Sequence, residues 1–148
     1  MSAKLYDVNI WVALSFQTHP AHAEAKVAFE SATSEAPAVF CRATQQSFLR
    51  LVTTLAIQKC YGSERIGNTL AWDRWKYLAA MPQVLFLGEP PGLQTHWSAY
   101  AQSELPAPKR WMDAYLAAFA RAYGISLLTL DNDFLDFEAL DVQVLSVE

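Results

Sequence analysis

Four aspartates are the side chains of this sequence whose types and spacing best suit chemistry: Asp7, Asp113, Asp131 and Asp133. Asp7 interrupts an apolar run, and Asp131 and Asp133 follow the apolar residues of the stretch LLTLDNDF. Carboxylates in such places cost solvation energy unless something pairs with them. If they meet, their repulsion requires raised pKa values or a bound cation, and oxygen ligands suit Mg²⁺ or Mn²⁺. Such an ion activates water beside a phosphate, so the pattern points to phosphodiester hydrolysis.

Taken one at a time, these aspartates have simpler interpretations. Asp113 falls in the first turn of an expected helix, where the helix dipole alone favours a carboxylate. Asp131 and Asp133 are residues typical of turns. Asp7 is harder to explain in this way, because it breaks an apolar segment. A functional interpretation therefore depends on whether the four residues come together.

Short apolar segments typical of strands alternate along the chain with longer segments typical of helices. The expected strands are residues 4–6, 38–41, 84–87, 125–130 and 142–147. The expected helices are residues 9–16, 20–32, 44–59, 63–80, 93–102 and 109–123, with Ser63 as an N-cap and Gly124 as a C-cap. This order predicts an α/β layer fold with a mostly parallel central sheet. Since no repeat or linker interrupts it, residues 1–148 are expected to form a single domain.

The expected sheet determines where the aspartates lie. Open parallel sheets bind ligands outside the carboxyl ends of their strands. Asp7 ends the first expected strand, and Asp131 ends the strand at residues 125–130. A right-handed crossover places the start of the helix that carries Asp113 at the same edge. We therefore expect three or four aspartates from distant parts of the chain to meet there.

Composition limits the other classes of function. The net charge of −4 and the pI of about 5.3 give no overall basic charge for nucleic-acid binding, although an acidic site would produce the same balance. Cys41 and Cys60 form no CxxC pair, and His19, His22 and His96 have no zinc-ligand spacing. The cysteines are expected to be reduced thiols of a cytoplasmic protein. The sequence has no glycine-rich phosphate loop and no apolar stretch of the roughly 18 residues that a membrane span requires.

The chain resembles the PIN-domain ribonucleases of the VapC type, which are toxins of toxin–antitoxin pairs. The resemblance rests on LYDVNIWVAL (residues 5–14), TQQSFLRLVT (44–53), MDAYLAAFARAYGISLLTLDNDF (112–134) and VQVLSV (142–147), in the order of the family. It implies a three-layer α/β/α sandwich and Mg²⁺- or Mn²⁺-dependent endonucleolytic cleavage of RNA. It also implies a homodimer and inhibition by a small cognate antitoxin.

The same resemblance assigns roles to single residues. By motif position, the acidic metal-binding residues are Asp7, Asp113 and Asp131, and Asp133 matches a further, less regular acidic position. Asn9 and Thr129 match small polar residues beside the catalytic site that would orient a water or a carboxylate. One departure concerns the helix near Thr44, where most of the family has a glutamate and this chain has none. Its absence predicts a single, weaker metal site, with Gln46 or Ser47 as the substitute contact to metal-bound water.

Positive side chains near these motifs are candidates for RNA contacts. Arg42, Arg50, Lys109 and Arg110 could hold phosphates beside the metal. For each of them, a solvated charge at a helix end is an equally good interpretation.

Two other functions are compatible with an acidic pocket. A PIN-like module without activity would act through protein or RNA binding, and the missing glutamate and the acidic pI favour it. A receiver domain would need an acidic pair after the first strand and a lysine after a late strand. Here the first strand ends in the single Asp7 and the late strand in aspartates, so we set the receiver aside.

Overall fold

A parallel sheet forms the centre of the protein. The computed structural model describes residues 2–62 and 64–147. Within that part, a five-stranded sheet has the order β3-β2-β1-β4-β5, and every neighbouring pair is parallel. The strands are β1 (Lys4–Tyr6), β2 (Ala38–Phe40), β3 (Val84–Phe86), β4 (Ser126–Thr129) and β5 (Val142–Val144). The predicted sheet is confirmed, and β1 and β4, which precede Asp7 and Asp131, are neighbours.

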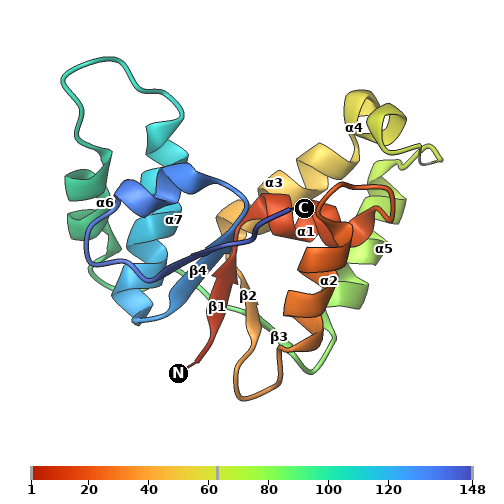
Figure 1. The fold of residues 1–148 in the computed structure, drawn as a ribbon, viewed down its shortest axis with the longest axis horizontal. Coiled ribbons are helices and arrows are strands. Elements are labelled where there is room, and N and C mark those ends of the chain that lie inside the picture. Colours follow the sequence, from red (N-terminus) through yellow and green to blue (C-terminus); the bar gives the residue numbers. More distant parts are fainter. Residues whose placement is uncertain (1, 63, 148) are drawn as a thin grey trace.

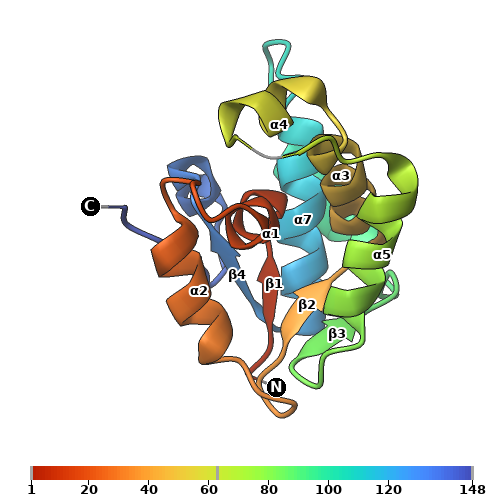
Figure 2. The ribbon, with the colours of Figure 1, turned by 90° about the vertical axis from the view of Figure 1, so that its right-hand side faces the viewer.

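Helices cover both faces of this sheet, which gives the predicted α/β/α sandwich (Figures 1 and 2). Leu5 and Leu127 point to one face, where they pack with α6 (Leu93–Ala101) and α7 (Arg110–Tyr123). Tyr6 and Leu128, the next residues along the same strands, lie in the core of the other face. That face is covered by α1 (Val8–Ser15), α2 (His22–Glu30), α3 (Arg42–Val52) and α5 (Asn68–Ala79). Successive strand residues therefore bury on opposite faces, as the near-continuous apolar strands indicate.

The predicted single helix over residues 44–59 is wrong, because it consists of two helices. α3 ends at Val52, and α4 (Leu55–Cys60) begins after Thr54 and takes a different direction (Figure 2). Thr54 is extended, and its hydroxyl accepts from the backbone N–H of Ile57 at 3.4 Å as an N-cap. The Thr53 hydroxyl donates to the carbonyl of Leu49 at 2.8 Å. Two threonines therefore end one helix and start the next through side-chain contacts with the backbone.

Other boundaries also differ from the prediction. α5 begins at Asn68, and the predicted cap Ser63 lies outside the described residues. The Ile66 carbonyl accepts from the side chain of Gln58, which anchors the segment before α5 in a non-helical path. The strand predicted to reach residue 147 stops at Val144, and a 3-10 helix, η1 (Asn132–Asp136), follows Asp131. Gly124, with a φ of 67°, ends α7 as predicted.

No helix within residues 2–62 and 64–147 has the length and apolar character needed to cross a membrane.

Candidate active site

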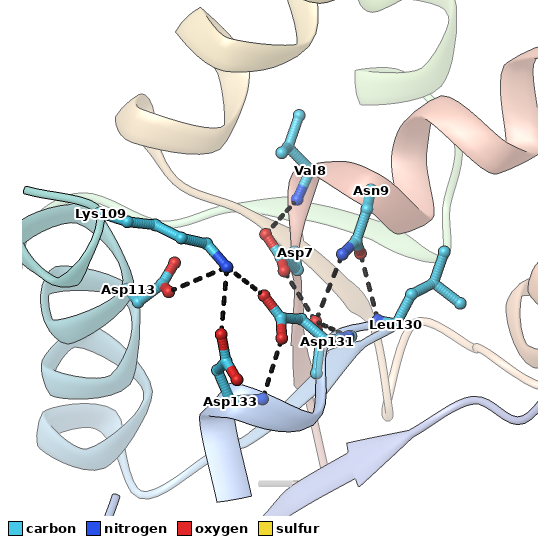
Figure 3. Close-up of polar contacts among 9 residues, drawn as sticks. Asp7, Val8, Asn9, Lys109, Asp113, Leu130, Asp131 and Asp133 are labelled. Atoms are coloured by element: carbon cyan, nitrogen blue, oxygen red, sulfur yellow. Dashed lines mark hydrogen bonds and ion pairs between the residues drawn. The ribbon is translucent and has the colours of Figure 1, made fainter. Parts of the chain in front are cut away.

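The four aspartates come together at the carboxyl edge of the sheet (Figure 3). Asp7 follows β1 and caps α1, with Oδ1 accepting from the backbone N–H of Val8 at 2.7 Å. Asp131 lies beyond the end of β4, and Asp133 belongs to η1. Asp113 lies in the first turn of α7, as predicted. The convergence expected from the strand order is therefore what the structure shows, while the roles of these residues stay a prediction.

Asp7 is the buried member of this group, with 7% of its surface exposed. The hydroxyl of Thr129 donates to Oδ2 of Asp7 at 2.7 Å, so both carboxylate oxygens have a donor. Burial raises the pKa of Asp7 to about 6, although these two hydrogen bonds oppose the shift, and the charges of Asp113 and Asp131 add to it. The charged form of Asp7 is therefore destabilised by its burial away from water.

Thr129 and Asn9 join the ends of the two central strands. Besides donating to Asp7, the Thr129 hydroxyl accepts from the backbone N–H of Asp131 at 3.0 Å. The side chain of Asn9 donates to the same hydroxyl at 3.5 Å and accepts from the backbone N–H of Leu130 at 3.3 Å. These contacts fix the position of Asp7 relative to Asp131. Both residues that the family pattern places beside the site thus lie in contact with it.

The ammonium of Lys109 lies among the other three carboxylates. Its Nζ is 2.7 Å from Oδ2 of Asp131, 3.3 Å from Oδ2 of Asp133 and 3.8 Å from Oδ2 of Asp113 (Figure 3). The hydrogen bonds to Asp131 and Asp133 raise the pKa of Lys109. Burial alone would raise the pKa of Asp131, but the hydrogen bonds from Lys109 and from the Asp133 backbone outweigh it and lower the pKa.

The pKa of Asp113 shifts in the opposite direction, because Asp113 is more deeply buried than Asp131 and also lies farther from the ammonium. Its burial raises its pKa, and the charge of Lys109 offsets this only in part. The ammonium therefore stabilises the charged form of Asp131 more effectively than that of Asp113.

Two adjoining cavities open onto the carboxylates. One, of about 230 Å³, lies between α3 and α7 and is lined by Asp7, Asp113, Lys109, Ser47, Arg50 and Met112, among others. The other, of about 300 Å³, is lined by Asp113, Asp133, Asp136, Lys109, Arg110 and Phe137, among others. Lys109 and Asp113 line both, so the lysine stands where the two cavities meet.

Of the two residues expected to substitute for the missing family glutamate, Ser47 lies nearer the site, and its role stays a prediction. It is half-buried on α3 and lines the smaller cavity with Asp7, whereas Gln46 is exposed and is absent from the lining. Sequence reasoning missed Met112 and Asp136 as lining residues. Asp136 follows Asp131 by five positions in an apolar stretch, which could have indicated a second acidic turn directed at the site.

The predicted RNA-contacting side chains do not all reach the site. Arg50 lines the smaller cavity. Arg42 contacts the side chain of Gln45 and lies over the ring of Phe86, and it is absent from the lining of both cavities. Arg110 lines the larger cavity, but its Nε donates to the carbonyl of Tyr100 at 2.8 Å and its guanidinium lies over a phenyl ring. Lys109 contacts carboxylates.

The sequence matches the model of the PIN domain family over residues 4–140. The chain is 38% identical over 143 residues to Ribonuclease VapC41 of Mycobacterium tuberculosis, covering 96% of this chain and 98% of that protein. It therefore belongs to the PIN domain family, as its motifs indicate.

Two solved structures share the fold. One is VapBC2 from Rickettsia felis bound to a DNA fragment from their promoter, with a TM-score of 0.64, 10% identity, and coverage of 96% of this chain and 98% of that chain. The other is VapBC-1 from nontypeable Haemophilus influenzae, with a TM-score of 0.66, 16% identity, and coverage of 96% and 97%.

The carboxylates are not assembled as a metal-ligand cluster. Among residues 2–62 and 64–147, no group of three His, Cys, Asp or Glu side chains is placed to hold a metal ion as the side chains stand. Their chemistry nevertheless suits a hard divalent cation, because the donors are carboxylate oxygens. Three of the carboxylates already gather around one positive charge, that of Lys109. The residues present therefore fit Mg²⁺ or Mn²⁺ in donor type and convergence.

Proposed function

We propose that this protein is a metal-dependent endoribonuclease that acts as the toxin of a toxin–antitoxin pair, with residues 1–148 as a single domain. The observation that carries the proposal is the convergence of Asp7, Asp113, Asp131 and Asp133 at one sheet edge in a PIN-family chain. The relative that is 38% identical over nearly the full chain is a ribonuclease by name. Asp7, Asp113 and Asp131 would hold Mg²⁺ or Mn²⁺, and Asp133 would lie beside them.

A bound divalent cation would supply the positive charge that a scissile phosphate needs and would make a neighbouring water more acidic. The protein holds the carboxylates in fixed positions. Thr129 and the Val8 backbone hold both oxygens of Asp7 in place, and Asn9 and Thr129 keep Asp131 in register with it. Such pre-organised contacts avoid reorganisation when charge develops in the reaction.

The smaller cavity is the proposed position of the RNA backbone. Arg50 lines this cavity together with Asp113 of α7, and its guanidinium can hold a phosphate by paired hydrogen bonds. Ser47 adds a small polar group to the same lining. Arg42 and Arg110 are weaker candidates, because other contacts within the protein occupy them.

Incubation of total cellular RNA with the purified protein tests this proposal. Samples with EDTA, Mg²⁺ or Mn²⁺ are compared for the wild type, Asp113→Asn and Asp73→Asn. Asp73 is an exposed aspartate of α5 that contacts Lys76 at 3.8 Å, so it controls for the loss of one carboxylate away from the site. We expect discrete fragments only with metal, and a loss of about 10²-fold or more for Asp113→Asn alone. Full activity of Asp113→Asn would refute the proposed site.

We further propose that a small antitoxin binds this protein, that it acts in the cytoplasm, and that it forms a homodimer. The support for an antitoxin is that both structures of similar fold are VapBC assemblies. For the dimer, α5 buries Ala71 in the core while Trp72 and Tyr77 stay exposed, which leaves an apolar surface. Light scattering of the purified wild type and, separately, of the Trp72→Glu variant tests the dimer. A monomeric wild type would contradict it.

A binding module without activity is the second candidate, and two observations favour it. The helix near Thr44 lacks the glutamate usual in the family, and a lysine lies among the carboxylates. This candidate predicts that no RNA is cleaved with either metal while RNA or protein binding persists. Electrophoretic mobility shifts with the same RNA samples would separate it from the nuclease.

A further inference from the structure

The ammonium of Lys109 contacts Asp131 and Asp113, two of the three residues of the proposed metal centre, and also Asp133. Oδ1 of Asp131 accepts from the backbone N–H of Asp133 at 2.9 Å, while Oδ2 accepts from Lys109 at 2.7 Å. Both oxygens of this carboxylate are therefore engaged. A cation that binds Oδ2 of Asp131 and the nearby oxygens of Asp133 or Asp113 must displace the ammonium first.

This contact depends on how the backbone places the lysine and the carboxylates. Lys109 directly precedes α7, and its carbonyl accepts from the N–H of Asp113 at 3.4 Å, so the two side chains share one turn. On the opposite side, Asp131 is fixed through its N–H, which donates to the hydroxyl of Thr129. The ammonium thus joins the start of α7 to the end of β4 (Figure 3).

Energetics favour an ammonium at this position. Clustered carboxylates repel one another, and a positive charge among them relieves that repulsion. The side chain of Lys109 is nevertheless 67% exposed, so solvent weakens each pair and a free path for release remains. A divalent ion carries twice the charge and can therefore replace the ammonium, but at reduced affinity.

We propose that Lys109 is an internal counter-ion of the metal-free protein, which competes with the divalent cation for Asp131, Asp133 and Asp113. This inference rests on the proposed function, because it assumes that these carboxylates take up a metal. It accounts for the carboxylates being gathered around an ammonium without forming a metal-ligand cluster. Because Lys109 lines both cavities, its displacement would also join them into one cleft beside the metal.

The alternative is that Lys109 is only a phosphate contact or a surface ion pair. In that case its removal would leave metal affinity unchanged, or lower it by disordering the carboxylates. Competition predicts the reverse, a rise in metal affinity when the ammonium is removed. The sign of the change therefore separates the two interpretations without any measurement of RNA cleavage.

Mn²⁺ titration of the full chain by calorimetry tests the inference with the wild type, Lys109→Met, Lys109→Arg and Lys26→Met. Lys26 is an exposed lysine of α2 that contacts Glu30 at 4.0 Å, and its loss is a matched control for one positive charge. We expect Lys109→Met to bind Mn²⁺ at least about tenfold more tightly than the wild type. Lys109→Arg should stay near the wild type, because it keeps the charge, and so should Lys26→Met.

Chemical denaturation supplies a second readout. In EDTA, Lys109→Met should unfold at lower denaturant than the wild type, and saturating Mn²⁺ should remove that difference. If Lys109→Met does not fold, Lys109→Gln takes its place.

The outcomes distinguish failure of the lysine proposal from failure of the metal centre. If the wild type binds Mn²⁺ and Lys109→Met binds it no more tightly, the lysine proposal is overturned and the metal centre stands. If neither protein binds Mn²⁺, the metal centre fails and the competition fails with it. Binding by Lys109→Met alone would support both.

Discussion

Asp7 and Asp131 follow neighbouring strands of one sheet, yet their surroundings are opposite. Asp7 is buried, accepts hydrogen bonds from two neutral donors, and has a pKa raised to about 6. Asp131 is partly exposed, contacts an ammonium at 2.7 Å, and has a lowered pKa. The same residue type at equivalent ends of β1 and β4 therefore destabilises the folded state at one position and is stabilised at the other.

This difference indicates that the two carboxylates respond differently to a bound cation. A buried carboxylate with a high pKa gains most when a cation arrives, because the cation offsets the cost of burying the charge. An exposed carboxylate paired with lysine gains less, because one positive charge only replaces another. We expect Asp7 to link metal binding to folding stability, and Asp131 to link it to the displacement of Lys109.

The largest expected effect is common to both residues. Asp7→Asn and Asp131→Asn should each lower metal-dependent RNA cleavage by about 10²-fold or more, because each removes a proposed ligand. Single-turnover cleavage at saturating Mn²⁺ measures this loss, with Asp73→Asn as the control. Near-normal cleavage by either variant would remove that residue from the proposed centre.

In the metal-free protein, the substitutions Asp7→Asn and Asp131→Asn should change the stability in opposite directions. The pKa of Asp7 is about 6 in the folded state and 3.8 in the unfolded state. The contribution of Asp7 to the free energy of unfolding is therefore fully present below pH 3.8 and is lost as the pH rises through 6. That loss corresponds to about 3 kcal/mol. In EDTA at pH 8, Asp7→Asn should therefore be more stable than the wild type by up to about 3 kcal/mol, and the gap should close toward pH 4.

Asp131→Asn should do the opposite. Because the pKa of Asp131 is lowered in the folded state, its charged form stabilises the fold at pH values above the pKa of the unfolded state. This stabilisation is lost as the pH falls through the pKa of the folded state. Because the ion pair is partly exposed, its loss at pH 8 should cost less than about 1 kcal/mol. Urea denaturation across the pH range tests both variants, and changes of the same sign would contradict the comparison.

A smaller effect is expected at the residue that joins the two regions. Thr129→Val keeps the shape of a fully buried side chain but removes the donor to Asp7 and the acceptor for the Asp131 N–H. Stability in EDTA should fall by about 1–3 kcal/mol, the usual cost of leaving buried polar groups unpaired. The exposed threonine of α6 gives the control Thr95→Val. Equal stability of the two variants would show that Thr129 does not hold Asp7 in place.

The convergence of the aspartates could be predicted from the sequence, because it follows from the parallel sheet alone. Asp7 and Asp131 end apolar strands, and a crossover helix starts at the same edge, so Asp113 had to lie nearby. The direction of long side chains could not be predicted in this way. Lys109 and Arg110 are adjacent basic residues, but one contacts carboxylates and the other a backbone carbonyl and a phenyl ring.

The boundaries that were wrong depend on similar tertiary or local contacts. The helix break at Thr53 and Thr54 results from hydroxyl groups that compete for backbone partners. The late start of α5 accompanies a contact between the Ile66 carbonyl and Gln58. The strands were identified from their patterns of apolar residues. No such pattern in the sequence predicts either of these two contacts.

The smallest expected effect concerns the glutamate that this chain lacks. Ser47 lines the cavity with Asp7 and Asp113, so Ser47→Glu would place a further carboxylate beside the proposed metal and should raise Mn²⁺ affinity about fivefold. Gln46→Glu makes a similar addition of charge on the exposed side of α3 and serves as the control. Calorimetric titration compares the two. An equal gain in both variants would mean that only overall charge matters, and that Asp7 and Asp131 act without a partner on α3.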